Sequence, residues 1–193
     1  LWLDRGKALF DRPAESGAPA CAGCHEDHSL TGAAARYPGW DATTERVINI
    51  EGRINACRTR HQETDALAYE SDALLALTIY VANLSHGTQM AVAIDGPAGD
   101  WFERGRNYYY QRRGQLDLAC NECHDANAGK MLRGDRLSEG QPVGYPIYRL
   151  DWQTVGSLHR RLRFCNVGVR AEPVSLGSDE YVALELFLAW RAR

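Results

Sequence analysis

The chain has 193 residues, a formal net charge of −3 and a hydrophobic fraction of 45%. That length allows one large domain or two small ones, and the balanced charge excludes a nucleic-acid coat and a disordered acidic tail. No apolar run approaches the ~20 residues that cross a bilayer, so we expect no membrane span and no nucleic-acid partner. The sequence opens directly on a helix-like segment, so we expect any export signal to have been removed already.

The first predicted element is a helix over residues 1–10, in which Gly6 and Phe10 lie on one face, one turn apart. A glycine inside a helix costs about 1 kcal/mol relative to alanine, so it usually has a packing reason. We therefore expect another helix to cross closely over Gly6.

Four of the six cysteines form two Cys-x-x-Cys-His motifs, CAGCH at residues 21–25 and CNECH at residues 120–124. This spacing is the attachment signature of c-type haem, in which two thiols bind the porphyrin and the histidine binds its iron. The predicted covalent attachment residues are Cys21, Cys24, Cys120 and Cys123, and the predicted proximal ligands are His25 and His124. Zinc sites or redox dithiols are the alternatives to two haem c groups.

The next predicted helix, over residues 71–84, begins with a Ser-Asp pair that suits a helix N-terminus. A boundary follows at residues 91–100, which carry Gly-Pro and Gly-Asp turn signals. The pattern then repeats, because Gly105 and Tyr109 precede the second motif by the same 15 and 11 residues as their counterparts precede the first. A second Ser-Asp-capped helix is predicted over residues 178–191.

This repeat favours haem over zinc, and it predicts a mostly α protein of two tandem domains. A first and a last helix that cross around a haem motif resemble a class I cytochrome c, so each domain is expected to wrap one covalent haem. We place the N-terminal domain at residues 1–92, with haem 1, and the C-terminal domain at residues 93–193, with haem 2 and the active site.

The second axial ligand is the open question in each domain. Met90 and Met131 are the only methionines, and neither has the position of a class I methionine ligand. A lone histidine is more often a surface residue than a ligand, so the spare histidines are weak candidates. They are His28, His61, His86 and His159.

The two remaining cysteines fit better, because Cys57 and Cys165 lie 14 and 13 residues before the two Ser-Asp caps. Each is preceded by an arginine at the fourth position before it, Arg53 and Arg161. We expect axial thiolates that stabilise ferric iron, with arginines keeping the sulfur ionised. A Cys57–Cys165 disulfide, or two ordinary buried thiols, is the alternative.

The run of residues 159–170, HRRLRFCNVGVR, has four arginines around Cys165 and no acid. Around Cys57 the arginines are interspersed with Glu51 and Glu63. The acid-free cluster suits a small oxyanion as substrate. Pairing of these arginines with haem propionates is the alternative.

These features together resemble the SoxA family, the cytochrome subunits of the SoxAX complexes of bacterial thiosulfate oxidation. The resemblance covers the whole chain and is most specific in RRLRFC, residues 160–165. It implies an enzyme, an L-cysteine S-thiosulfotransferase, which joins thiosulfate to a cysteine of the carrier SoxYZ and passes two electrons through c-type haems to an acceptor cytochrome c. The implied subunit partner is a SoxX-type cytochrome in a heterodimer.

By the same resemblance, Cys165 is both a ligand of haem 2 and the active-site cysteine, often found as a persulfide, and Arg161 binds the substrate. The implied iron ligands are His25 and Cys57 for haem 1, and His124 and Cys165 for haem 2. Haem c is attached outside the cytoplasm, so we expect a periplasmic protein. The alternatives are a dihaem thiosulfate dehydrogenase that makes tetrathionate, and a plain low-potential electron-transfer cytochrome.

Overall fold

The computed structural model describes residues 1–26, 29–132 and 134–193. The first half contains α1 (Trp2–Asp11), α2 (Cys21–Cys24), the 3-10 helix η1 (Ala34–Arg36), β1 (Gly39–Asp41), β2 (Arg46–Ile48), α3 (Ile50–His61) and α4 (Asp72–Asn83). The second half contains η2 (Gly96–Ala98), α5 (Gly99–Tyr110), α6 (Cys120–His124), β3 (Met131–Leu132), β4 (Asp135–Arg136), β5 (Ile147–Arg149), β6 (Thr154–Gly156), α7 (Leu158–Gly168) and α8 (Asp179–Arg191). Within these ranges, no helix combines the length and apolar character that a bilayer crossing requires.

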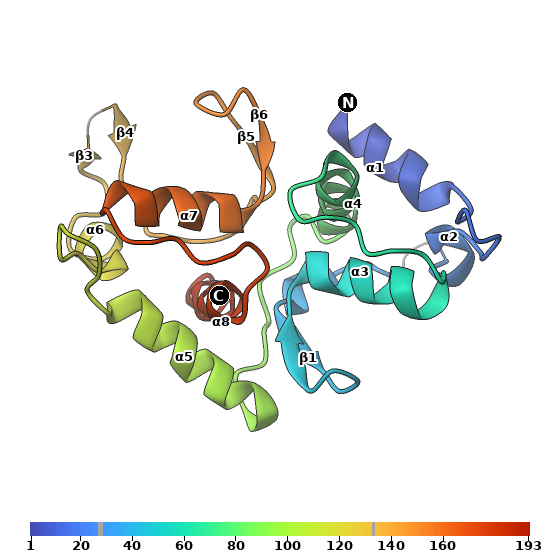
Figure 1. Cartoon of the computed structure of the whole chain (residues 1–193), viewed down its shortest axis with the longest axis horizontal. Helices are drawn as coiled ribbons and strands as arrows, with labels where there is room; N and C mark the ends of the chain where they lie inside the picture. The colour runs from blue at the N-terminus through green and yellow to red at the C-terminus, as the bar shows by residue number, and fades with distance from the viewer. Residues whose placement is uncertain (27–28, 133) are drawn as a thin grey trace.

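The two halves lie side by side and are built alike (Figure 1). In each, the first helix crosses the last, α1 over α4 and α5 over α8. A Cβ on Gly6 would lie 2.1 Å from the carbonyl oxygen of Ala76, and one on Gly105 would lie 1.9 Å from that of Ala183. The predicted close crossings are therefore confirmed in both halves, since only glycine leaves room for the facing backbone.

The predicted caps of the two last helices are confirmed as well. The Ser71 hydroxyl accepts a hydrogen bond from the Leu74 amide, and the Ser178 hydroxyl accepts one from the Tyr181 amide. Each cap satisfies one of the backbone donors that a helix N-terminus leaves without an intrahelical partner. As a result α4 and α8 begin at defined points, within one residue of the predicted starts.

The repeat also includes a hairpin and the helix that follows it. The β1–β2 hairpin pairs Gly39 with Ile48, and the β5–β6 hairpin pairs Ile147 with Gly156 in the same register. Each hairpin leads through a capping side chain into the helix that carries an arginine and a cysteine four residues apart, α3 or α7. Equivalent positions of the two hairpin–helix units therefore differ by 108 residues.

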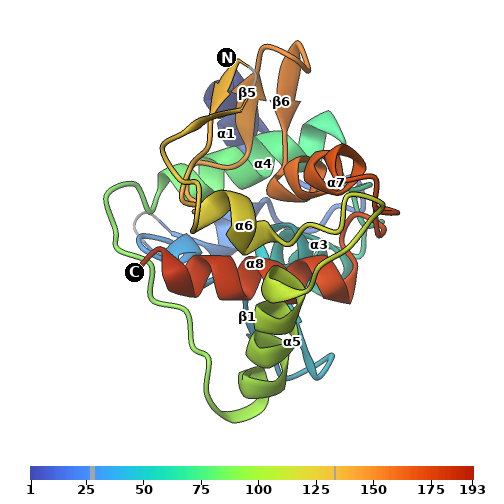
Figure 2. The same cartoon turned by 90° about the vertical axis from the view of Figure 1, so that its left-hand side faces the viewer.

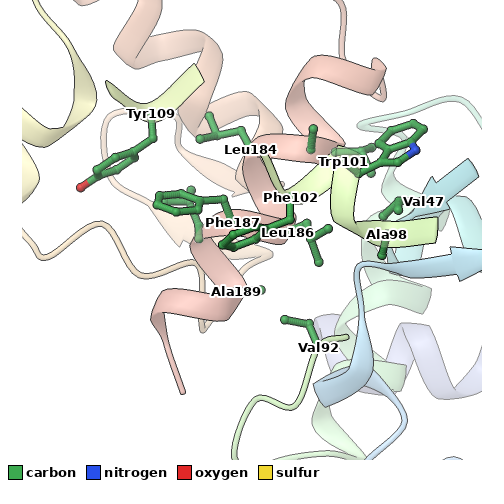
Figure 3. Packing of buried hydrophobic residues seen from close by; sticks show 13 residues of the cluster. Val47, Val92, Ala98, Trp101, Phe102, Tyr109, Leu184, Leu186, Phe187 and Ala189 are labelled. Carbon is green, nitrogen blue, oxygen red and sulfur yellow. The ribbon is translucent and has the colours of Figure 1, made fainter. Parts of the chain in front are cut away.

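The main hydrophobic core surrounds α8 (Figure 3). Phe187 lies in its centre, with ring centroids 5.6 Å from Phe102 and 5.2 Å from Tyr109 on α5. Burying an aromatic ring of this kind contributes about 1.5–3 kcal/mol. Val47 of β2 and Val92 of the connecting segment belong to the same cluster, so α8 packs against residues of both halves.

A buried polar network joins α3 to α7 across α8. Figure 2 shows the ribbons of these three helices from the side. Asn49, the cap of α3, donates to Glu185 at 3.0 Å and to the hydroxyl of Tyr69 at 2.8 Å. His159 of α7 accepts from the Gly177 amide through Nδ1, so its Nε2 carries the proton and donates to Glu185 at 3.0 Å. The two cysteine-bearing helices are thereby held to the same residue of α8.

Candidate functional site

Each Cys-x-x-Cys-His motif forms a short helix, α2 or α6, that follows the first helix of its half. Cys21 packs against the cluster around Phe10, and Cys120 packs against the core around α8. Burial raises the pKa of the Cys120 thiol to about 11, and it also raises the pKa of Cys21. In both motifs the first thiol therefore lies against apolar side chains, which suits a bond to the edge of a hydrophobic porphyrin.

The histidine of the second motif is oriented by its backbone neighbours. Nδ1 of His124 lies 2.8 Å from the carbonyl oxygen of Ser138, and because a carbonyl only accepts, Nδ1 carries the proton. Nε2 is then the nitrogen left to bind a metal through its lone pair. Gly140, at φ +72°, packs so closely that a Cβ there would lie 3.0 Å from Cγ of the ring.

The surroundings of the histidine in the first motif disfavour its protonated form. Burial lowers the pKa of His25, and the positive charge of Arg53 and the neighbouring His61 lower it further. The ring lies against Phe10, with centroids 6.4 Å apart. An imidazole in this state can bind iron through its lone pair.

The two remaining cysteines each face the motif of their own half. Cys57 on α3 acts electrostatically on Cys21, and Cys165 on α7 acts on Cys120 and Cys123. All six cysteines are free, so the alternative of a Cys57–Cys165 disulfide is not what the structure contains. Each half thus brings two attachment thiols, an imidazole and a further thiol together.

This set of donors fits haem c in both halves. Soft thiolates and imidazole are the ligands that haem iron takes in cytochromes, and the spacing of the attachment thiols matches two vinyl groups. Other donors are placed less well: both ring nitrogens of His159 are already bonded, and Met131 is 61% exposed on β3. Met90 packs against the core around α8, and His28 lies outside the described residues.

The expected ionised state of Cys165 concerns a thiol bound to iron; in the protein by itself, the arginines are not the strongest influence on this thiol. Burial is the largest influence and raises the pKa of Cys165 above its ordinary value, while Arg161 and Arg149 lower it by less. The protein therefore presents a neutral thiol with cations beside it. The positive charge of a bound iron would complete the ionisation, because a metal deprotonates a coordinating thiol outright.

In the first half, the arginines of α3 are tied to a buried carboxylate. Arg60 binds Asp41 through two hydrogen bonds of 2.6 Å and 2.9 Å, and Arg53 lies 3.4 Å from the same carboxylate. These contacts hold the pKa of Asp41 well below its usual range, with the Arg60 hydrogen bonds as the largest cause. Position along the sequence indicates Glu51 and Glu63 as the nearby acids and misses Asp41, which is the actual partner.

In the second half, only part of the predicted arginine cluster turns toward Cys165. Arg160 stacks on Trp152 at 4.7 Å and pairs with Glu70, while Arg163 and Arg170 are exposed. Arg161 is different, because its Nη1 atom is buried and has no hydrogen-bond partner among the described residues. A guanidinium nitrogen left this way beside a cysteine suits an anion that the protein itself does not supply.

A further arginine, Arg149 at the end of β5, also acts on Cys165, although it lies outside the basic run that the sequence singles out. The sequence contains a feature that points to Arg149. A Tyr-Pro pair begins 20 residues before each axial cysteine candidate, at residues 37–38 and 145–146. When the two halves are aligned on this Tyr-Pro pair, Asp41 and Arg149 occupy equivalent positions. The charge at this position is therefore reversed between the two halves.

Comparison with known proteins identifies the group to which the chain belongs. A family model described as the SoxA/TsdA cytochrome c domain matches residues 5–90. The chain is 39% identical to the L-cysteine S-thiosulfotransferase subunit SoxA of Pseudaminobacter salicylatoxidans, over 99% of this chain and 68% of that protein. The chain belongs to the SoxA family. The corresponding subunit of Rhodovulum sulfidophilum is also 39% identical, over 99% of this chain and 67% of that protein.

A solved structure agrees with this assignment over nearly the whole chain. The crystal structure of SoxXA from P. pantotrophus superimposes with a TM-score of 0.92 at 36% identity, covering 99% of this chain and 73% of that one. The predicted cytochrome c fold is thereby confirmed, and with it haem c as the cofactor class of the family. The assignment of individual ligands and of the active-site residues stays a prediction that the geometry described above supports.

Proposed function

We propose that this protein is the haem-bearing subunit of an L-cysteine S-thiosulfotransferase, which joins thiosulfate to a cysteine of a SoxYZ-type carrier. The observation that carries the proposal is the buried Nη1 of Arg161, which has no hydrogen-bond partner among the described residues and lies one helical turn before Cys165 on α7. A thiol and a guanidinium with such a nitrogen on one helix face suit a substrate with a nucleophilic sulfur and a sulfonate group. The names of the relatives support the same reaction.

Two haem c groups are part of the proposal. The first would be attached through Cys21 and Cys24, with His25 and Cys57 as iron ligands. The second would be attached through Cys120 and Cys123, with His124 and Cys165 as iron ligands. The donor sets of the two halves support both sites, and when bound, haem c supplies one-electron acceptors for the two electrons that the reaction releases.

In the first step, the Cys165 sulfur forms a bond to the terminal sulfur of thiosulfate. Cys165–SH and S₂O₃²⁻ give Cys165–S–S–SO₃⁻, one proton and two electrons, and the proton leaves to water. Both sulfur atoms of the new bond are oxidised by one electron each. In the second step, the carrier thiolate attacks the sulfur that bears the sulfonate, so the carrier gains S–SO₃⁻ and Cys165 leaves as the thiolate.

Arg161 holds the sulfonate in both steps. Its guanidinium can donate two parallel hydrogen bonds to sulfonate oxygens, which orients the terminal sulfur toward the thiol four residues along the helix. It also offsets the negative charge that would otherwise repel the incoming carrier thiolate. Because one face of this guanidinium is already desolvated, its interaction with an anion is stronger than on the open surface.

The partners and the location follow from the same chemistry. The solved relative from P. pantotrophus is SoxXA, which supports a SoxX-type cytochrome as the second subunit of a heterodimer. The carrier would be SoxYZ, and a soluble cytochrome c would accept the electrons. Because haem c is attached outside the cytoplasm, we place the protein in the periplasm.

The test compares Cys165→Met with Cys57→Met, two matched changes at equivalent positions of the two halves. Both variants are produced with haem attached, in complex with the SoxX-type subunit, and are assayed with the carrier, thiosulfate and oxidised cytochrome c. We expect Cys165→Met to lose conjugation by more than 100-fold while it keeps both covalent haems, and Cys57→Met to keep it. Mass spectrometry of the carrier gives the readout, as one added S–SO₃ group per carrier thiol.

Three results would contradict the proposal. Conjugation at the normal rate by Cys165→Met would remove Cys165 from the reaction. Release of tetrathionate by the wild type without any carrier would instead indicate a thiosulfate dehydrogenase. A bare Cys165 thiol in every fresh preparation, together with no carrier product, would leave an electron-transfer cytochrome.

A further inference from the structure

The two halves carry the same hairpin–helix unit with one pair of positions inverted in charge. In the first unit, the end of β1 holds Asp41 and the helix α3 holds Arg53 and Arg60. In the second unit, the equivalent positions hold Arg149, Arg161 and Gly168. The equivalence rests on identical hairpin registers, Asp41 opposite Arg46 and Arg149 opposite Thr154.

The first unit shows where an anion sits in this frame. The Asp41 carboxylate reaches from the strand end onto the helix face and binds Arg60 at 2.6 Å and 2.9 Å, with Arg53 at 3.4 Å. Only 5% of the Asp41 side chain is exposed, so this is an enclosed oxyanion between guanidinium groups. The cysteine of the unit, Cys57, lies on the same helix, α3, four residues after Arg53 and three before Arg60.

The second unit has the same frame without the carboxylate. Arg161, which corresponds to Arg53, has a buried Nη1 with no partner among the residues that the structure describes. Gly168 replaces Arg60, and Arg149 replaces Asp41, so a guanidinium now approaches from the strand side. Two arginines therefore occupy the positions at which the first unit has an arginine and a carboxylate.

Tyr145 supports this arrangement independently. Its hydroxyl is subject to the charges of Arg161, Arg149 and Cys165, just as the hydroxyl of Tyr37 is subject to those of Arg53, Asp41 and Cys57. Each tyrosine stands at the start of its unit, immediately before the proline. The same three positions therefore surround the same tyrosine in both halves.

We propose that Arg149 is a second substrate-binding residue. It donates hydrogen bonds to the sulfonate of thiosulfate from the strand side, while Arg161 donates to the same group from the helix side. The substrate anion then takes the place that Asp41 fills in the first unit. Asp41 fills the anion position of the first unit with a carboxylate of the protein itself and closes that unit to other anions, so the enzyme has one substrate site. This inference rests on the proposed function, because it names how the same site selects its substrate.

The present contacts of Arg149 are compatible with this role. Its Nε donates to Asp151 at 3.1 Å, its Nη2 lies 3.5 Å from Asp135, and its guanidinium lies 5.5 Å from the centre of the Trp152 ring. Asp135 is 71% exposed, so that contact is solvated and weak. Asp151 and Trp152 thus fix the direction of the guanidinium, while the solvated contact of Nη2 with Asp135 can be exchanged for a contact with an anion.

The experiment measures both turnover and binding in the complete haem-bearing complex. Arg149→Gln and Arg149→Lys are compared with Arg163→Gln, which removes one charge from an exposed arginine on α7, two residues from Cys165. A hydrogen bond to a charged group contributes about 1.5–3 kcal/mol, which corresponds to roughly 10- to 150-fold in affinity. We expect Arg149→Gln to raise KM for thiosulfate by that factor with little change in kcat, Arg149→Lys to recover part of the affinity, and Arg163→Gln to stay within about twofold of the wild type.

Direct titration with thiosulfate by calorimetry, without carrier or electron acceptor, separates this inference from the proposed function. Weaker binding by Arg149→Gln supports the inference even if the wild type makes no carrier product. An equal loss of thiosulfate affinity in Arg149→Gln and Arg163→Gln would mean that only the total positive charge matters, and it would overturn the inference. Unchanged thiosulfate affinity in Arg149→Gln, with a shifted haem reduction potential, would assign Arg149 to a haem propionate and overturn it as well.

The first unit offers a reciprocal test. Asp41→Asn removes the internal anion and leaves Arg53 and Arg60 facing a neutral amide. We expect the number of thiosulfate ions bound per protein to rise from one to two. A stoichiometry that stays at one in a folded Asp41→Asn protein would contradict the idea that the carboxylate closes this unit.

Discussion

The crossing of α5 and α8 gives a prediction whose size follows from the structure. In Gly105→Ala the new Cβ would meet the carbonyl oxygen of Ala183 at 1.9 Å and its carbonyl carbon at 2.5 Å. Ordinary contact begins at 3.4 Å, so the two helices must separate by about 1.5 Å at this point. Both of these atoms belong to the backbone, which cannot rotate away as a flexible side chain could.

Overpacking of this kind costs about 1–3 kcal/mol or more, and the higher helix propensity of alanine returns about 1 kcal/mol. Separating the helices also loosens the contacts of Phe187 with Phe102 and Tyr109. We therefore expect Gly105→Ala to lose about 2 kcal/mol of unfolding free energy. For a chain of this size that corresponds to a Tm lower by about 4–8 °C.

Gly99→Ala is the matched control, because it places the same side chain on the same helix. Its Cβ would lie 3.6 Å from the Ile94 carbonyl oxygen, an ordinary contact. The assay is urea and thermal unfolding of the haem-bearing protein, followed by far-UV circular dichroism and tryptophan fluorescence. If Gly105→Ala proves as stable as Gly99→Ala, the glycine is not there to admit the facing backbone, and the reasoning fails.

Three further predictions concern single side chains. Asp41→Asn should cost about 2 kcal/mol at neutral pH, since it weakens charge-assisted hydrogen bonds from Arg60. The difference should begin to shrink as the pH falls below about 4, the usual pKa of an aspartate in the unfolded chain, and should disappear only below the strongly depressed pKa of folded Asp41. Burial, followed by neighbouring carboxylates, raises the pKa of Glu51 to about 8. The folded protein therefore holds this proton over a pH range in which the unfolded chain releases it. Between about pH 5 and pH 8, the unfolding free energy of the wild type should fall by about 1.4 kcal/mol per pH unit relative to Glu51→Gln. Gly140→Ala should displace the His124 ring and reduce the low-spin fraction of ferric haem in absorption spectra, because a Cβ would lie 3.0 Å from the ring.

Each of these has a control on the same chain. The control for Asp41→Asn is Asp65→Asn, and the control for Glu51→Gln is Glu15→Gln, because Asp65 and Glu15 are exposed. Both control changes should alter stability by less than about 0.5 kcal/mol at any pH. Gly144→Ala serves for the third, since φ is +99° there and a Cβ would meet nothing within 4 Å. Equal spectra of Gly140→Ala and Gly144→Ala, a pH-independent cost of Asp41→Asn, or parallel pH profiles of Glu51→Gln and wild type would each refute the corresponding argument.

The sequence by itself was enough for everything that depends on local spacing. The attachment motifs, the caps at Ser71 and Ser178 and the glycine–aromatic pairs are determined by residues a few positions apart, where helix geometry dictates which side chains meet. The internal repeat then allowed Cys57 and Cys165 to be singled out, because a matching position in two halves is informative without any structure. The SoxA resemblance was available for the same reason.

The tertiary structure decided the charges around each cysteine. Asp41 and Arg60 are 19 residues apart and come from different elements, so only the folded hairpin brings them together. Of the arginines in residues 159–170, helix direction turns Arg161 inward and leaves Arg163 and Arg170 in solvent. For the pKa of Cys165, burial also has a larger effect than the nearby cations, since the pKa is raised although Arg161 and Arg149 lower it. Electrostatic interactions depend on distance through space and on exclusion of water, and a linear sequence states neither.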